Sequence, residues 1–269
     1  MARVIDVWDV ETFDEELMTA LHESAELVLN YLDTDRELSF RRETAEFESP
    51  NRSNPYAAGY HELLEDLSRK MDARTIRGWH YTRLTDPEVE KLRTTGIYLS
   101  TLETTRQRLN SQVACGQVSV EIAEALLKAS PLQNREQRDA RSHRFWMTSH
   151  PVGIDDDDVN LLLGNWGGEA IYSWLEDPSL QQIVSTIGKP RVLEVAVPLK
   201  ATSKAFYASK AVVAAFADVL GCIPNFRDFD ICCVSELGPE VILAVHSEGE
   251  VTYSRIANGH PTTFRPKRE

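Results

Sequence analysis

Short apolar runs rich in β-branched residues are the feature that most limits how this chain can fold. Runs such as VLEVAVP and DICCV are typical of strands in the interior of a sheet. From residue 76 onward the sequence contains candidate strands at 76–84, 144–149, 170–174, 191–198, 229–235, 240–246 and 251–256. Because these strands do not alternate strictly with single helices, they predict a mixed α+β fold and disfavour a doubly wound parallel sheet.

Helical periodicity marks the front of the chain and several stretches between the strands. In residues 13–32 apolar side chains recur near a period of about 3.6 residues, which predicts a helix. The polar, turn-rich segment 33–55 is expected to be an exposed connection. Gly96 is expected to end one helix. Further helices are expected at 56–71, 86–95, 104–113, 119–128, 157–163 and 203–220.

The distribution of charge separates the front of the chain from the rest. The chain of 269 residues has a net charge of −13. Residues 1–50 hold 14 acidic and 4 basic residues, whereas the remainder is nearly neutral. We therefore predict an acidic, mostly helical N-terminal extension at 1–74 and one further domain at 75–269. Nucleic-acid binding needs a basic footprint, so nucleic acid is disfavoured as a partner, although a local positive cleft in the near-neutral part stays open.

Several classes of site are not indicated. The chain has no run of about 18 apolar residues, which a membrane span requires, and it starts without a signal-peptide pattern. A cytoplasmic protein with no membrane partner is therefore expected. The 4 cysteines include no CxxC pair, so neither a metal site nor a disulfide framework is expected. GxGxxG and Walker-type glycine loops are absent from the sequence.

The stretch GWHYTRL, residues 78–84, combines aromatic, imidazole and hydroxyl side chains on one expected strand. In a half-buried strand Trp79 and Tyr81 share one face, whereas His80 and Thr82 share the other and are available to a ligand. Arg83 adds a planar guanidinium suited to phosphate or carboxylate. A lone histidine is more often a core residue that hydrogen-bonds to the backbone, and this alternative stays open for His80.

This strand and its neighbours resemble the ADP-ribosyltransferase superfamily, in the branch whose active site contains His, an aromatic or hydroxyl residue, and Glu. Trp79-His80-Tyr81-Thr82 matches the strand motif, residues 87–95 match the helix that follows it, and Gly96-Ile97 matches the next turn. HYTRL followed by NWGGEAIYSW is also similar to a group of uncharacterised bacterial proteins associated with this fold. The resemblance covers roughly residues 75–250. It implies a split mixed β-sheet with flanking helices.

The resemblance further implies that NAD is the co-substrate. It assigns His80 to the NAD ribose and to the catalytic residues, with Tyr81 and Thr82 beside it. Arg83 would lie near a phosphate group.

The nicotinamide ring would stack on an aromatic side chain, which the family places on a strand that ends in Ser or Thr. The candidates are Tyr98 and the adjacent pair Phe145 and Trp146. Trp146, on a strand that continues to Thr148, is preferred. Bulky aromatic residues are as often part of a core, and this alternative stays open.

A glutamate is the third element that the resemblance implies. It would bond the ribose 2′-hydroxyl and stabilise the positive charge that develops as nicotinamide leaves. Glu169 follows two glycines beside Trp166, which is included among the NAD-binding residues, and is expected to open an apolar strand. Glu240 opens a late strand and agrees better with the usual order of the family. Glu169 is slightly preferred, and a solvated carboxylate at a strand end is the alternative for either residue.

The resemblance implies an enzyme, an NAD-dependent mono-ADP-ribosyltransferase that transfers ADP-ribose to an acceptor. The acceptor can be a protein, a nucleic acid or a small molecule, and the sequence does not choose among them. A bacterial toxin or antiviral defence effector is the expected setting, with an antitoxin or regulatory protein as a partner. The alternatives are a catalytically inactive binding module of the same fold and an NAD glycohydrolase.

Overall fold

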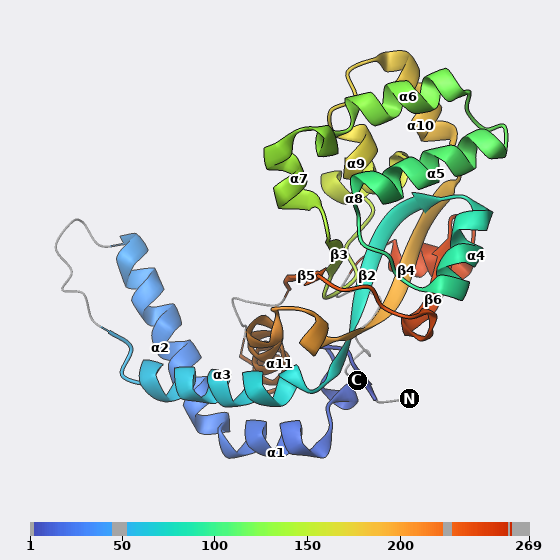
Figure 1. The fold of residues 1–269 in the computed structure, drawn as a ribbon. Helices are drawn as coiled ribbons and strands as arrows, with labels where there is room; N and C mark the ends of the chain where they lie inside the picture. Colours follow the sequence, from blue (N-terminus) through green and yellow to red (C-terminus); the bar gives the residue numbers. More distant parts are fainter. Residues whose placement is uncertain (1–2, 45–52, 223–227, 258, 260–269) are drawn as a thin grey trace. The chain divides into compact units, whose positions relative to one another are not determined.

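The chain is an α+β protein. A computed structural model describes residues 3–44, 53–222, 228–257 and 259 (Figure 1). Within these residues it has 12 α-helices and 6 β-strands. It divides into two compact units, the first made of Met1–Arg77 and Pro198–Phe229 and the second of Gly78–Val197 and Asp230–Glu269. The boundary predicted between residues 74 and 75 lies close to Arg77, where the first segment of the first unit ends. Residues 198–229 were predicted to be part of the domain at 75–269, but they belong to the first unit.

Helices dominate the first unit. They are α1 (Glu15–Glu23), α2 (Ala25–Thr44), α3 (Ala57–Asp72) and α11 (Ala205–Val219). α3 packs against α11. α11 is apolar along most of its length, and Val212, Val213 and Phe216 are among its buried side chains. The short strand β1 (Val4–Ile5) pairs in parallel with the first residues of β2 (Thr75–Leu84).

The front of the chain is more helical than the sequence predicts. The single helix predicted at 13–32 is two helices, because α1 ends at Glu23 and α2 starts at Ala25, after the single residue Ser24. The predicted connection at 33–55 is wrong for residues 33–44, which continue α2, and residues 45–52 of that prediction lie outside the described residues. Strong helix formers such as Leu, Glu and Arg carry the helix through a stretch whose overall polarity suggested a loop.

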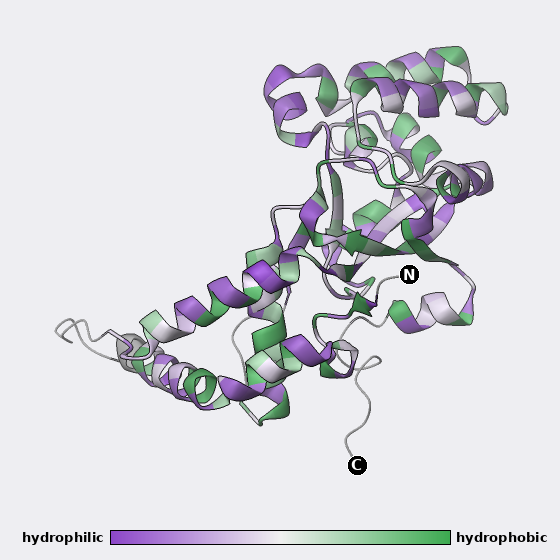
Figure 2. Ribbon diagram, turned by 60° about the horizontal axis from the view of Figure 1, so that its bottom comes forward, coloured by the Kyte–Doolittle hydropathy of each residue, from purple (hydrophilic) through white to green (hydrophobic). Residues whose placement is uncertain are grey.

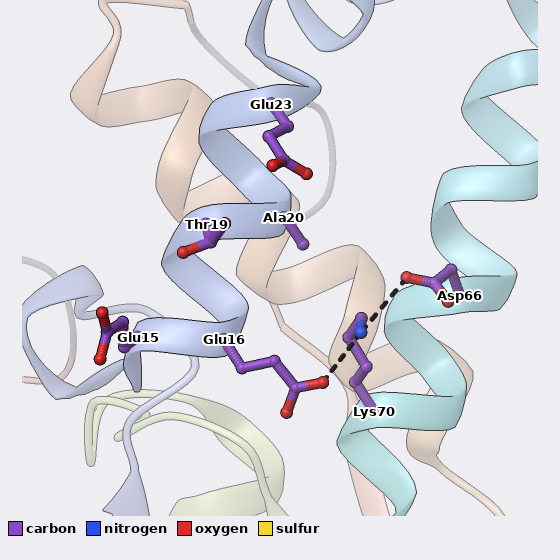
Figure 3. A pocket seen from close by; sticks show the side chains of 7 residues that line it. All are labelled: Glu15, Glu16, Thr19, Ala20, Glu23, Asp66 and Lys70. Carbon is purple, nitrogen blue, oxygen red and sulfur yellow. Dashed lines mark hydrogen bonds and ion pairs between the residues drawn. The ribbon is translucent and has the colours of Figure 1, made fainter.

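Part of the acidity of the front segment is paired inside the first unit. Arg74, just after α3, binds Asp14 with an Nε to Oδ2 distance of 2.7 Å and Glu16 with an Nη2 to Oε2 distance of 2.8 Å. Lys70 lies between Glu16 and Asp66 in a hollow formed by α1 and α3 (Figure 3). The hydrogen bond from Arg74 lowers the pKa of Asp14 despite partial burial. The segment therefore keeps less free negative charge than its composition suggests.

A sheet with the strand order β5-β3-β2-β4-β6 forms the centre of the second unit. β3 is antiparallel to both β2 and β5, and β6 is antiparallel to β4. The predicted strands at 76–84, 144–149, 191–198, 229–235 and 240–246 are confirmed, with boundaries that differ by a few residues. The bounds of these strands, apart from β2 given above, are β3 (Phe145–Thr148), β4 (Lys189–Pro198), β5 (Asp230–Cys233) and β6 (Ile242–Ser247).

The second unit surrounds this sheet with short helices, which carry hydrophilic and hydrophobic residues side by side (Figure 2). α5 and α6 are neighbours and bury a cluster that includes Trp166, Ile171 and Leu175. The helices are α4 (Asp86–Thr95), α5 (Leu102–Ala114), α6 (Val120–Ala129), α7 (Arg135–Arg141), α8 (Asp157–Gly164), α9 (Glu169–Tyr172), α10 (Pro178–Thr186) and α12 (Val251–Ile256), and the 3₁₀ turn η4 (Pro239–Val241) precedes β6.

Two predicted strands are wrong. Residues 170–174 lie largely in α9, because Gly167 and Gly168 take positive φ values of 93° and 63° and turn the chain directly into a helix. Residues 251–256 form α12. In that helix the buried side chains are Tyr253 and Ile256, three positions apart as one helix face requires, although Val and Tyr favour strands in general.

Gly96 fixes the chain where α4 ends, as the sequence predicts. Its N–H donates to the Leu92 carbonyl at 2.8 Å, and its φ is 85°. A Cβ at this position would overlap the Leu237 carbonyl oxygen and lie 2.5 Å from the carbonyl carbon of Gly238. The next residue, Ile97, exchanges two backbone hydrogen bonds with Leu237, of 2.8 Å and 3.1 Å. Only glycine lets these two segments meet so closely.

We expect Gly96→Ala to lower the free energy of unfolding by about 3 kcal/mol or more, because it adds both backbone strain and a clash. Gly116→Ala is the matched control, since Gly116 has a φ of 71° but nothing within 4 Å of the added methyl group. That control should cost only about 1 kcal/mol. Urea unfolding of both variants measures the difference, and equal losses would contradict the close approach at Gly96.

Candidate functional site

His80 lies on β2 with its ring held by the neighbouring strand β3. Its Nδ1 is 2.8 Å from the carbonyl oxygen of Trp146, and its ring centroid is 4.2 Å from that of Phe145. A carbonyl oxygen only accepts, so Nδ1 carries the hydrogen in this contact. Among the described residues Nε2 has no hydrogen-bond partner, and in a neutral ring this nitrogen is an acceptor. The strand pair therefore presents one fixed acceptor to a ligand.

The imidazole of His80 is neutral at physiological pH. Removal of the ring from water lowers its pKa to about 4, the Trp146 carbonyl works in the opposite direction, and the charge of Arg108 lowers it further. A neutral ring with a hydrogen on Nδ1 can accept a hydrogen bond at Nε2 from a hydroxyl group but cannot pair with an anion.

Arg108 on α5 is held in place by two residues of the second unit. Its Nε donates to Glu88 Oε1 at 2.8 Å, and its guanidinium carbon lies 4.8 Å from the centroid of the Trp166 ring. Its Nη2 is buried and has no hydrogen-bond partner among the described residues. Burial disfavours the charge on Arg108, but the nearby Tyr98 and Glu88 outweigh it and raise its pKa. Arg108 is thus a cation whose orientation is fixed by Glu88 and Trp166.

Glu88 is a buried carboxylate that organises this region. Its Oε2 accepts from Trp166 Nε1 at 2.9 Å and from the backbone N–H and hydroxyl of Thr85 at 2.9 Å and 3.0 Å. Thr85 and Glu88 form a reciprocal capping box at the start of α4. Burial raises the pKa of Glu88, but Arg108 and these hydrogen bonds together lower it below its usual value. Glu88 is therefore ionised in the folded chain.

Four of the predicted NAD-binding residues serve the packing of the second unit. The hydroxyl of Tyr81 accepts from the Val152 N–H at 2.6 Å and donates to its carbonyl at 3.1 Å. Thr82 is 7% exposed, and Trp166 is 0% exposed. Arg83 donates from Nε to the Ile187 carbonyl at 2.8 Å and from Nη1 to the Leu163 carbonyl at 3.4 Å, so its guanidinium holds the backbone. Of the predicted pair, His80 is half-buried and Thr82 is buried.

Trp146 and Thr148 lie on β3, next to His80. Trp146 is 46% exposed, and Thr148 donates to the His150 carbonyl at 2.6 Å. Side chains alternate along a strand, so the Trp146 ring lies on the opposite face of β3 from Phe145, which contacts His80. Tyr98 is half-buried, and Lys91 Nζ lies 5.6 Å from the centroid of its ring.

The two candidate glutamates have different surroundings. Glu169 begins α9 rather than a strand, and its exposed carboxylate forms an ion pair with Arg141. Glu240 lies in η4 at the entrance to β6, and its carboxylate folds back over Gly238. The η4 turn follows Leu237, which pairs with Ile97 one residue before Tyr98. The expectation that Glu169 opens a strand is wrong, and Glu240, expected to open a late strand, lies in the turn η4 directly before β6.

Sequence reasoning did not single out Glu88 or Arg108. A signal existed for Glu88, because Thr-x-x-Glu at the start of a predicted helix indicates a capping box. Arg108 carries no such signal, since its partner is 20 residues away and its direction depends on how α5 packs. Among the described residues, no group of three or more His, Cys, Asp or Glu side chains is placed to hold a metal ion.

Three kinds of known proteins were compared with the chain. No family model, curated protein or solved structure matches the chain.

In the part of the chain that is described, none of the helices combines the length and apolar character needed to cross a membrane.

The free energy of unfolding should fall between pH 7 and pH 5 partly because of His80. Its pKa is about 4 in the folded chain and about 6.5 in an unfolded chain, so the unfolded chain takes up the proton first as the pH drops. We expect His80→Gln to reduce this loss by on the order of 1 kcal/mol in urea unfolding. His61→Gln, at an exposed position of α3, is the control. An unchanged pH dependence in His80→Gln would contradict a neutral, desolvated imidazole.

Glu88→Gln should lower the free energy of unfolding by about 3 kcal/mol, because it leaves the buried guanidinium of Arg108 without its counter-charge. Glu90→Gln, at an exposed position of the same helix, should change it by less than about 1 kcal/mol. Thermal or urea unfolding of both variants compares them. Similar losses would show that Glu88 does not organise the region.

Proposed function

We propose that the second unit is an NAD-dependent ADP-ribosyltransferase with the split mixed β-sheet of that superfamily. The observation that carries this proposal is the fixed acceptor at His80. Its Nδ1 is bound to the Trp146 carbonyl and its ring is neutral, so Nε2 is suited to accept a hydrogen bond from a ribose hydroxyl. The resemblance of WHYT to the family motif names the same residue for the same task.

Tyr98 is the aromatic residue that we assign to nicotinamide. It follows the Gly96-Ile97 turn, and Ser100, two residues later, pairs with Arg144, the residue before Phe145, whose ring contacts His80. Trp146, which the sequence favoured, projects from the face of β3 opposite Phe145 and His80.

Glu240 is the glutamate that we assign to the departure of nicotinamide, ahead of Glu169. It stands at the entrance to the late strand β6, where the family places this residue. Among the described residues its carboxylate has no ion pair, whereas that of Glu169 is paired with Arg141. A free carboxylate can stabilise positive charge on the ribose in the transition state.

In the proposed reaction the bond between ribose C1′ and the nicotinamide nitrogen breaks, and its electron pair leaves on neutral nicotinamide. An O–H or N–H group of the acceptor then forms the new bond to C1′ and releases its proton to solvent. The acceptor is a macromolecule or a small molecule, and a toxin or defence effector remains the setting that the resemblance suggests. A regulatory partner of the acidic front segment belongs to that setting.

Release of nicotinamide from NAD by the purified chain tests the proposal. We expect turnover by the wild-type chain, and a loss of about 10²- to 10³-fold in kcat for Glu240→Gln and His80→Ala. Glu236→Gln, an exposed carboxylate just before η4, is the matched control. Glu169→Gln tests the second candidate in the same assay, and it should retain activity.

The fate of ADP-ribose separates the related functions. Attachment to an acceptor supports the transferase, whereas release of all ADP-ribose in free form indicates an NAD glycohydrolase. Binding of NAD without nicotinamide release indicates an inactive binding module. A wild-type chain that neither binds nor cleaves NAD would overturn the proposal.

A further inference from the structure

The guanidinium of Arg108 has an unused edge. Among the described residues only its Nε–H finds an acceptor, which is Glu88 Oε1. Its Nη2 is buried without a partner, yet the side chain as a whole keeps 19% exposure. Leaving a buried N–H without a hydrogen bond costs about 1 to 3 kcal/mol, so a purely structural arginine would be expected to use these donors.

The same guanidinium is held rigidly by its surroundings. Glu88 binds the Nε side, and the Trp166 ring covers one face of the guanidinium plane. Trp166 in turn donates its Nε1–H to Glu88 Oε2, so the three side chains fix one another. A guanidinium fixed in this way is pre-organised, because little rotamer entropy remains to be lost when a ligand binds.

The unused edge belongs to the region of His80. Ser100, just before α5, accepts from the His143 N–H at 2.8 Å and donates to the Arg144 carbonyl at 3.3 Å, and the next residue, Phe145, contacts the His80 ring. In agreement with this arrangement, the charge of Arg108 lowers the pKa of His80. Lys91 adds a second positive charge at 5.6 Å from the centroid of the Tyr98 ring. The neutral imidazole cannot pair with an anion, so Arg108 supplies the anion-binding chemistry that His80 lacks.

We infer that Nη1 of Arg108, which has no partner among the described residues, binds the diphosphate of the dinucleotide, an inference that rests on the proposed function. The charge-assisted N–H donors of a guanidinium match the oxygens of a phosphate group. Arg83, the residue that the sequence suggested for this task, directs its Nε to the Ile187 carbonyl. Glu88 and Trp166 act as positioning residues, because they orient Arg108 and do not themselves reach the ligand.

Calorimetric binding of three probes to the full chain tests this inference. The probes are ADP-ribose, nicotinamide riboside, which lacks a diphosphate, and inorganic pyrophosphate. Arg108→Lys keeps the charge beside Glu88 but removes the fork, and we expect it to weaken ADP-ribose binding by about 10-fold or more. Its affinity for nicotinamide riboside should stay within about 2-fold. Arg106→Lys, an exposed arginine of the same helix, should leave all affinities unchanged.

Two further variants separate a binding role from a structural one. The double variant Glu88→Gln with Arg108→Gln removes both charges together, so it avoids an unpaired buried ion, and it should lose ADP-ribose while still binding nicotinamide riboside. Arg108→Lys that binds ADP-ribose as wild type does would overturn the inference. An equal loss of both ligands in Arg108→Lys would also overturn it, because that pattern indicates a structural role alone.

Failure of this inference is distinguishable from failure of the proposed function. A wild-type chain that binds pyrophosphate through Arg108 but does not bind NAD would contradict the function and support the diphosphate site. If the wild-type chain and Arg108→Lys bind NAD with the same affinity, the function is supported and the diphosphate site at Arg108 is contradicted. A wild-type chain that binds none of the probes would overturn both.

Discussion

The buried carboxylate of Glu88 is the interaction on which the second unit depends. An ionised group away from water is costly, and it persists only when hydrogen bonds and an opposite charge replace the lost hydration. Thr85, Trp166 and Arg108 supply that replacement from three separate parts of the chain. One side chain therefore connects the cap of α4 to α5 and to the segment before α9, and it fixes where each of them lies.

This connection links folding to the chemistry of the site. The requirement to neutralise Glu88 sets the position of Arg108, and Arg108 in turn keeps unused donors near His80. His80 contributes the complementary property, because a desolvated neutral ring is an acceptor without charge. His80 thus provides a fixed acceptor for a hydroxyl group, and Arg108 provides a fixed donor for an anion. A ribose diphosphate has both a hydroxyl group and an anionic group to match them.

Local features of the sequence predicted much of this fold. The elements and site residues that were missed depend on glycine conformations and on long-range contacts. The run of β-branched residues in β4 and the glycine that ends α4 act within a few residues, and both were predicted. The composition of 170–174 suits a strand, but the conformations of Gly167 and Gly168 produce a helix there. The sequence singled out His80 from its strand neighbours, whereas Arg108 depends on side chains that are 20 and 58 residues away along the chain.

A crystal structure of the chain with ADP-ribose tests the central claim most directly. The account predicts that Arg108 Nε stays on Glu88 while Nη1 contacts a diphosphate oxygen, and that a ribose hydroxyl donates to His80 Nε2. A ligand bound with its diphosphate away from Arg108, or an Arg108 side chain that has left Glu88 to reach it, would contradict the claim that Glu88 positions the binding group.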